Sequence, residues 1–227
     1  MINPNRKAFF LLGLVLGVLF LMVDVSIFPG FTQFVDRISF YAVNQWNPSP
    51  FLDIIMINLA LYGRELVWGG LIIVFVLFGN EKQKKLGLML SILFIILLTS
   101  GAIVKTVDFR LRPNYALSNV RLLVSPEIDS SFPSGHTLLV VGGAVVSLIW
   151  MNRKWAFLLT IEAILVSFSR IYVGVHYPTD VLGGALLGAS GALILCSKSE
   201  LLDKVYQSFQ DKFGKSRALS FLHELFN

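Results

Sequence analysis

Residues 86–105 read LGLMLSILFIILLTSGAIVK, which is nineteen uncharged residues followed by Lys105. An α-helix rises about 1.5 Å per residue, so about twenty mostly apolar residues can cross the ~30 Å hydrocarbon core of a bilayer. The run therefore predicts a membrane-spanning helix that ends at Lys105, close to the membrane surface.

The composition of the whole chain agrees with a membrane protein. Of 227 residues, 55% are hydrophobic and 15% are charged, whereas about a quarter of a soluble domain is charged. Long apolar runs predict six spans, over residues 8–28, 63–80, 86–105, 134–151, 155–173 and 180–197. We therefore expect an all-α polytopic membrane helix bundle with six transmembrane helices, and a single domain over residues 1–227.

Lysine and arginine are unevenly divided between the two sides of these spans. Twelve lie on the side of the two chain ends and seven on the other side. Because cytoplasmic loops are enriched in basic residues, both ends are predicted to be cytoplasmic in a multi-pass protein of the cell membrane. These loops also account for the net charge of +5, so no nucleic-acid partner is expected.

Two segments outside the spans have amphipathic patterns. Apolar residues at helical spacing within 31–61 predict a helix that lies in the outer membrane interface. Residues 198–227 form an amphipathic cytoplasmic tail, whose lysines suit the anionic lipids of the inner leaflet. Its two apolar stripes contain Leu201, Leu202, Val205, Phe209 and Phe213, then Leu219, Leu222, Leu225 and Phe226.

Three short motifs hold polar residues that the apolar spans do not explain. The first is Lys105 with Arg112-Pro113, the second is Pro133-Ser134-Gly135-His136, and the third is Ser169-Arg170 with His176 and Asp180. The predicted topology places all three on the outer face of the membrane.

The second motif has the pattern of a helix start. Pro133 and Ser134 precede an apolar run, and the first turn of a helix offers unpaired backbone N–H groups to an anion. Gly135 would let a ligand approach that backbone closely. Taken alone, a helix cap followed by an incidental His136 is the simpler interpretation.

The third motif places a histidine four residues before an aspartate. A carboxylate that binds one imidazole nitrogen fixes the tautomer and leaves the lone pair of the other nitrogen available for attack. Taken alone, however, His176 and Asp180 are equally well explained as a surface pair or as metal ligands.

The cations decide between these interpretations. Lys105, Arg112 and Arg170 have no matching acids in the motifs, so they call for an anion, and arginine matches phosphate oxygens two at a time. The same cations would repel a divalent metal held by the two histidines and Asp180. We therefore expect a phosphoryl-transfer site with no metal and no cofactor.

With these spacings, the motifs resemble the three signatures of the type 2 phosphatidic acid phosphatase superfamily, in its integral-membrane lipid phosphatase branch. The resemblance is close over roughly residues 60–195. It implies that His176 attacks phosphorus to form a phosphohistidine, that Asp180 positions His176, and that His136 protonates the departing oxygen. It also implies that the phosphoryl oxygens are held by Lys105, Arg112, Ser134, Gly135 and Arg170.

The resemblance leads us to expect a hydrolase that removes the terminal phosphate of a lipid phosphate or diphosphate at the outer leaflet. Undecaprenyl diphosphate is the favoured substrate, followed by phosphatidylglycerol phosphate and phosphatidate. The alternative is a protein that binds or transports lipid phosphates without turnover. A vanadate-dependent peroxidase, which belongs to the same superfamily, is disfavoured by the membrane spans.

Other polar and small residues receive structural interpretations. Glu162, inside the fifth predicted span, is expected to form an interhelical hydrogen bond. Gly184, Gly188 and Ala192, at intervals of four, predict close approach of the last span to another helix. The remaining charges near the motifs are expected to be loop charges, with Arg110 or Arg121 open to contacting a second phosphate: Asp108, Arg110, Arg121, Glu127 and Asp129.

Overall fold

The computed structural model describes residues 5–23, 29–46 and 49–213, and these contain helices and loops but no β-strand. In chain order the helices are α1 (Arg6–Val23), α2 (Pro29–Asn44), α3 (Pro50–Asn58), the π-helix η1 (Leu59–Gly69), α4 (Gly70–Phe78), α5 (Glu81–Val107), α6 (Pro113–Ala116), α7 (Gly135–Trp150), α8 (Arg153–Tyr172), α9 (Pro178–Ser197) and α10 (Ser199–Phe213).

Five helical segments are long and apolar enough to cross a membrane, namely α1, the continuous stretch Pro50–Phe78, α5, α8 and α9. The apolar helix α7 is shorter. These five segments and α7 correspond to the six predicted spans, so the expected all-helical membrane bundle is confirmed.

The second long helix begins earlier than the sequence predicts. It runs without interruption from Pro50 to Phe78, whereas hydropathy places this span at 63–80 and residues up to 61 in an outer segment. The side chain of Ser49 explains the early start, because its hydroxyl accepts a hydrogen bond from the Leu52 amide at 3.3 Å. Two charged residues in η1 interrupt the apolar run but not the helix.

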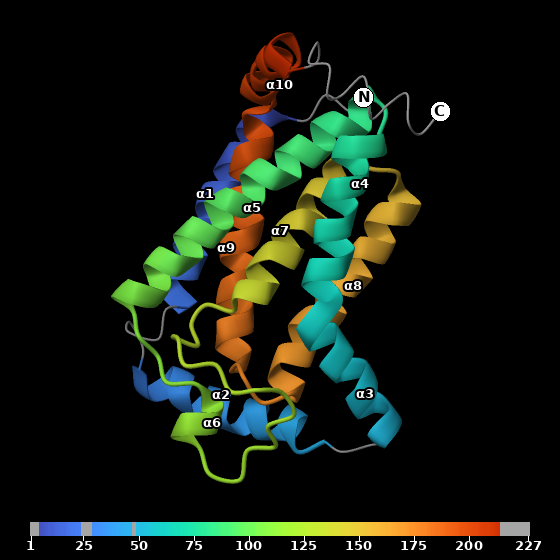
Figure 1. Cartoon of the computed structure of the whole chain (residues 1–227). Coiled ribbons are helices and arrows are strands. Elements are labelled where there is room, and N and C mark those ends of the chain that lie inside the picture. The colour runs from blue at the N-terminus through green and yellow to red at the C-terminus, as the bar shows by residue number, and fades with distance from the viewer. Residues whose placement is uncertain (1–4, 24–28, 47–48, 214–227) are drawn as a thin grey trace.

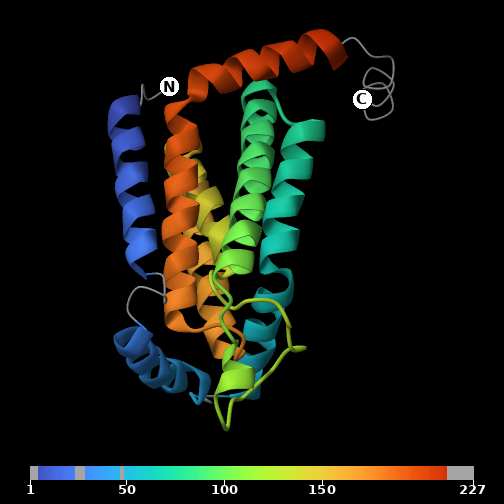
Figure 2. The ribbon, with the colours of Figure 1, turned by 90° about the vertical axis from the view of Figure 1, so that its left-hand side faces the viewer.

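The two amphipathic helices lie at opposite ends of the bundle. Figure 1 shows α2 and α6 at one end and α10 at the other, and Figure 2 shows α10 running across its end of the bundle. Lys85 and Asp203 join α10 to the start of α5 at 2.9 Å. The first half of the predicted tail is thus a helix, while its second apolar stripe lies outside the described residues.

The last span, α9, packs against α1 and α7. Added at Gly184, a Cβ would lie 2.6 Å from the Ser134 carbonyl oxygen, and one added at Gly188 would overlap the Leu138 carbonyl oxygen. Only glycine permits this approach of α9 to the backbone of α7. The predicted packing role of the small residues in this span is confirmed.

Glu162 also has the predicted role. Its carboxylate accepts a hydrogen bond from Trp68 Nε1 at 2.8 Å, which joins α8 to η1. Trp68 is fully buried, so the indole N–H has its partner inside the bundle rather than in water.

Candidate active site

The three motifs meet at the end of the bundle that holds α2 and α6. Lys105 and Arg170 lie in the last turns of α5 and α8, and Arg112 directly precedes α6. His136 lies in the first turn of α7, and His176 lies between α8 and α9. Three helix ends and two loops therefore supply these five residues of one site.

Direct contacts join the motifs to one another. Arg112 Nη1 lies 3.2 Å from His176 Nε2 and donates to the Val175 carbonyl at 3.0 Å, so the first motif touches the third. The Ser134 amide donates to the Asp180 carbonyl at 2.9 Å, so the second motif also touches the third.

The surroundings of His176 fix both its charge and its tautomer. Burial lowers the pKa of its imidazole well below the usual value, and Arg112, Arg170 and Lys105 lower it further. Because a guanidinium has no acceptor, the Nε2 atom that faces Arg112 must carry the lone pair. The proton of the neutral ring is therefore on Nδ1, and the lone pair of Nε2 faces Arg112.

Asp180 lies on the Nδ1 side of His176. Its Oδ2 atom is 3.4 Å from Nδ1, and both side chains are almost completely buried. This separation is longer than a well-formed N–H···O bond, and Oδ2 also accepts a hydrogen bond from the Tyr177 amide at 2.7 Å. The carboxylate is thus placed to hold the Nδ1–H tautomer and to stabilise a positive ring.

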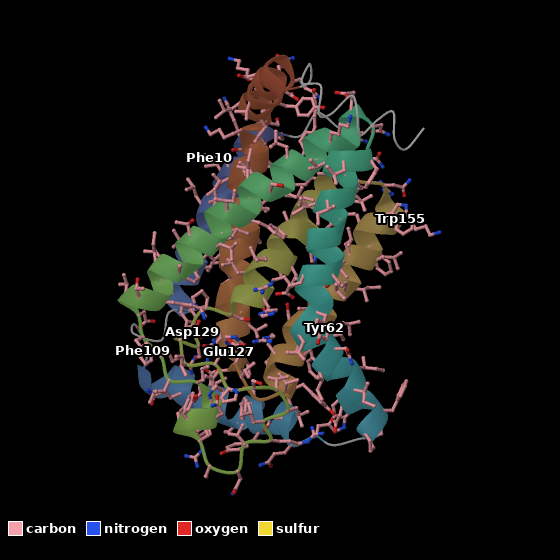
Figure 3. All side chains as sticks on the ribbon, viewed as in Figure 1. Phe10, Tyr62, Phe109, Glu127, Asp129 and Trp155 are labelled. Atoms are coloured by element: carbon pink, nitrogen blue, oxygen red, sulfur yellow. The ribbon has the colours of Figure 1, made fainter. Side chains whose placement is uncertain are left out.

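The motif cations have acidic partners, contrary to the sequence expectation. Glu127 bridges Arg112 and Arg170 with contacts of 2.6 and 2.5 Å. Asp129 bridges Arg112 and Lys105 with two contacts of 2.6 Å. Both acids come from the loop before α7, at the α2–α6 end of the bundle (Figure 3). They are ligands of the cations rather than solvated loop charges.

The pKa values of the two acids show that they are ionised in these pairs. Burial opposes the charge of Asp129, but hydrogen bonds from Lys105 and Arg112 outweigh it and lower the pKa to about 2. Burial likewise opposes the charge of Glu127, and Arg170 and Arg112 lower its pKa below the usual value. Two negative charges therefore neutralise much of the cationic cluster.

His136 has an acidic neighbour that the sequence did not single out. Its Nε2 atom is 3.9 Å from Glu65 Oε1, and Arg64 contacts the same carboxylate oxygen. Arg64 and Glu65 of the π-helix η1 thus lie near the site. From hydropathy alone, the same two residues would be predicted to lie at the membrane interface.

The start of α7 fits the predicted anion site. Ser134 is fully buried, and its hydroxyl accepts a hydrogen bond from Thr137 Oγ1 at 3.1 Å. A Cβ added at Gly135 would meet no atom within 4 Å. Open space therefore borders the first backbone N–H groups of the helix, where a ligand oxygen can bind.

Arg110 and Arg121, which the sequence leaves open as contacts for a second phosphate, are both paired with acids. Arg110 binds Asp36 and Asp180 at 2.6 and 2.7 Å. Arg121 pairs with Asp53, and its guanidinium lies 5.2 Å from the centre of the Tyr172 ring. We therefore assign both arginines to contacts within the protein.

This arrangement suits the transfer of a phosphoryl group. A neutral imidazole, whose Nε2 lone pair faces Arg112, lies beside a cluster of cations that can bind the oxygens of a phosphoryl group while the imidazole attacks its phosphorus. Among the described residues, no three His, Cys, Asp or Glu side chains are grouped so that they could hold a metal ion.

Comparison with known proteins gives the family. Residues 84–201 match the model of the PAP2 superfamily, which is more than half of the chain. An undecaprenyl-diphosphatase of Sulfolobus acidocaldarius is 36% identical over 81% of this chain and 88% of its own length. An undecaprenyl-diphosphatase of Bacillus subtilis is 33% identical over 72% of this chain and 87% of its own length.

A solved structure of a transmembrane phosphatase has a similar fold. The crystal structure of a transmembrane PAP2-type phosphatidylglycerolphosphate phosphatase from Bacillus subtilis superposes with a TM-score of 0.67 and 26% identity. The match covers 90% of this chain and 98% of that one. The chain belongs to the PAP2 superfamily, as a multi-pass membrane lipid phosphatase.

Proposed function

We propose that this phosphatase acts as a single domain and removes the terminal phosphate of undecaprenyl diphosphate or a closely similar isoprenoid diphosphate. The two relatives named undecaprenyl-diphosphatases support this choice of substrate. Phosphatidylglycerol phosphate ranks next, on the similarity to the Bacillus subtilis phosphatase, and phosphatidate follows.

The contact between Arg112 and His176 carries the proposal. A phosphoryl group whose oxygens bind the Arg112 guanidinium has its phosphorus next to His176 Nε2, only 3.2 Å from Arg112 Nη1. Binding or transport of a lipid phosphate needs the cations but not a neutral imidazole with a buried carboxylate behind it. We therefore favour turnover over binding alone.

The reaction has two steps. His176 Nε2 first attacks the terminal phosphorus, the bond from that phosphorus to the bridging oxygen breaks, and protonated His136 gives its proton to that oxygen. Water then attacks the same phosphorus, the phosphorus–nitrogen bond breaks, and His136 takes a proton from the water. Inorganic phosphate leaves, and no metal ion takes part.

Asp180 supports both steps, because it faces the positive ring that exists while the phosphoryl group is attached. The oxygens of the transferred group are held by Lys105, Arg112 and Arg170, with Ser134 and Gly135 at the start of α7. These donors stabilise the charge that builds up on the equatorial oxygens in each transition state.

We further propose that the site faces outward and that both chain ends are cytoplasmic. The basic residues near the α10 end of the bundle support this orientation: Arg6, Lys7, Lys82, Lys84, Lys85, Arg153, Lys154, Lys198 and Lys204. Cysteines introduced at the exposed positions Ile128 and Leu201 test it, since native Cys196 is buried. In intact cells, an impermeant maleimide should label Ile128→Cys and not Leu201→Cys; the reverse pattern contradicts the orientation.

Phosphate release by the purified, detergent-solubilised protein tests the function. Undecaprenyl diphosphate, phosphatidylglycerol phosphate and phosphatidate are compared by kcat/KM, with and without EDTA, for the wild type and for His176→Ala. We expect the diphosphate to react fastest, EDTA to have no effect, and His176→Ala to be inactive. A preference for a monophosphate would overturn the substrate choice, and loss of activity with EDTA would overturn the metal-free mechanism.

A further inference from the structure

Asp180 has a second contact that the three motifs do not include. One of its carboxylate oxygens lies near His176, and the other, Oδ1, accepts a hydrogen bond from Arg110 Nη1 at 2.7 Å. Arg110 lies two residues before Arg112, inside the first motif but at none of its defined positions. Its guanidinium therefore reaches the side of Asp180 that faces away from His176.

Arg110 is held from several sides. Its Nη2 binds Asp36 at 2.6 Å, its Nη1 donates to Thr179 Oγ1 at 2.9 Å, and its guanidinium lies 3.9 Å from the centre of the Tyr177 ring. Burial disfavours its charge, but Asp180 and Asp36 raise the pKa of Arg110 above the usual value. The guanidinium of Arg110 is thus charged and held in place by these contacts, and Arg110 is not a solvated loop residue.

Asp36 connects α2 to this group. Its side chain is 1% exposed and accepts a hydrogen bond from the Thr179 amide at 2.9 Å, besides its contact with Arg110. The opposite face of α2 is apolar and exposed at Phe34 and Ile38. The amphipathic helix α2 therefore turns its single carboxylate inward, against Arg110 and the first turn of α9.

A buried carboxylate stays ionised only when charge and hydrogen bonds compensate for the loss of water. Asp180 is fully buried, and its ring partner His176 is neutral. Arg110 supplies the positive charge in direct contact with it, and the Tyr177 amide supplies a further hydrogen bond. Removing the guanidinium would take away both the counter-charge and the anchor of Oδ1.

We propose that Arg110, backed by Asp36, is a positioning residue of the phosphatase reaction. It keeps Asp180 ionised and oriented, so that Asp180 can hold the Nδ1–H tautomer of His176 and stabilise the positive ring of the phosphohistidine. The inference rests on the proposed role of His176 as the nucleophile. It adds Arg110 and Asp36 to the residues on which turnover depends, although neither touches the substrate.

The chain offers a matched control for the alternative that Arg110 only holds helices together. Arg121 also pairs with a carboxylate, that of Asp53, and also lies over a tyrosine ring, that of Tyr172. This second arginine–carboxylate–tyrosine group is built around Asp53, which also accepts a hydrogen bond from the Tyr172 hydroxyl at 2.7 Å, and not around Asp180. Its loss therefore measures the cost of breaking such a group at a distance from the chemistry.

The experiment compares purified Arg110→Gln, Arg110→Lys, Asp36→Asn and Arg121→Gln in steady-state and single-turnover assays with undecaprenyl diphosphate. For Arg110→Gln we expect kcat and the rate of phosphohistidine formation to fall on the order of 100-fold, with KM changed less than about threefold. Arg110→Lys should recover about tenfold, because it restores the charge but not the fork. Asp36→Asn should lose about tenfold, and Arg121→Gln less than about threefold.

Each outcome bears on the inference. A normal kcat in folded Arg110→Gln, or an equal loss in Arg121→Gln, would overturn it. If Arg110→Gln does not fold, Arg110→Lys and Asp36→Asn decide, since wild-type turnover in both would also overturn it. His176→Ala separates a failure of the proposed function from a failure of the positioning role. An active His176→Ala contradicts the proposed function. An inactive His176→Ala beside a fully active Arg110→Gln contradicts only the positioning role.

Discussion

The carboxylate of Glu127 binds the guanidinium of Arg112, with Oε2 2.6 Å from Nη2. The same carboxylate binds Arg170 through its other oxygen at 2.5 Å. In the proposed mechanism a phosphoryl group binds the same guanidinium N–H groups, so we expect substrate and product to compete with Glu127 for them. We therefore expect the acids of the loop before α7 to set how tightly an anion is held at the site.

This competition predicts the effect of Glu127→Gln. An amide keeps the size of the side chain but binds arginine more weakly, so inorganic phosphate should inhibit the variant about 5- to 10-fold more tightly. The effect is modest because water screens the Glu127 carboxylate, whose side chain is 38% exposed. Glu200→Gln, which loses an exposed pair with Arg6 at the other end of the bundle, is the control. Equal phosphate inhibition of wild type and Glu127→Gln would contradict the competition.

The pKa of His176 predicts how stability depends on pH. Since the folded pKa lies well below the unfolded value of about 6.5, the unfolded chain binds a proton that the folded site refuses. Above about pH 6.5, His176 therefore does not lower the free energy of unfolding. Below that pH, it lowers the free energy of unfolding by up to about 1.4 kcal/mol per pH unit. Denaturant unfolding of wild type and His176→Gln between pH 7.5 and 5 tests this; parallel curves would refute it.

The pair of Trp68 and Glu162 predicts a difference between two substitutions. Glu162→Gln keeps an acceptor for the indole N–H, so stability should change by less than about 0.5 kcal/mol. Glu162→Leu leaves the buried Trp68 N–H without its partner and should cost about 1–2 kcal/mol. Thermal unfolding in one detergent compares them, and an equal cost in both variants would argue against the hydrogen bond.

The contact between α9 and α7 predicts a steric effect at Gly188. Alanine there would press its Cβ into the Leu138 backbone, so Gly188→Ala should lower Tm and reduce the folded yield. Gly69→Ala is the matched control, because a Cβ there meets no atom within 4 Å and alanine favours the helix by about 0.5–1 kcal/mol. If Gly188→Ala is as stable as Gly69→Ala, the close helix contact is absent.

Much of the fold follows from local features of the sequence. A run such as 86–104 is uncharged over the width of a bilayer, and Lys105 does lie in the last turn of its helix. The small residues of α9 also predict its close approach to a neighbour, because their spacing alone puts them on one helix face. These features need no knowledge of the path of the loops.

The remaining features depend on contacts between distant segments. Glu127 and Asp129 lie two residues apart in a polar loop, and nothing in that pattern says that the loop folds back onto Arg112. Asp36 and Arg110 are separated in sequence by two long helices, so their ion pair follows only from the position of α2. Such pairs surround the motif residues, and the sequence motifs do not predict them.

The second long helix, which starts at Pro50, shows a different limit of prediction from sequence. Hydropathy measures how apolar a window is, and the charges in η1 end the apolar run there. Helix continuity depends on backbone hydrogen bonds, which these side chains do not interrupt. The π-helix η1 includes Glu65, whose Oε1 lies 3.9 Å from His136 Nε2, so a residue that ends the apolar run also lies near the site.

Rapid-quench trapping of the intermediate tests the central claim most directly. Wild-type protein is mixed with substrate labelled in the terminal phosphate, quenched in alkali within the first turnover, digested and analysed by mass spectrometry. We predict one phosphorylated residue, His176, with the phosphate acid-labile and absent from His176→Ala. Phosphate on another residue, or steady release of phosphate with no phosphorylated protein at any time, would contradict the account.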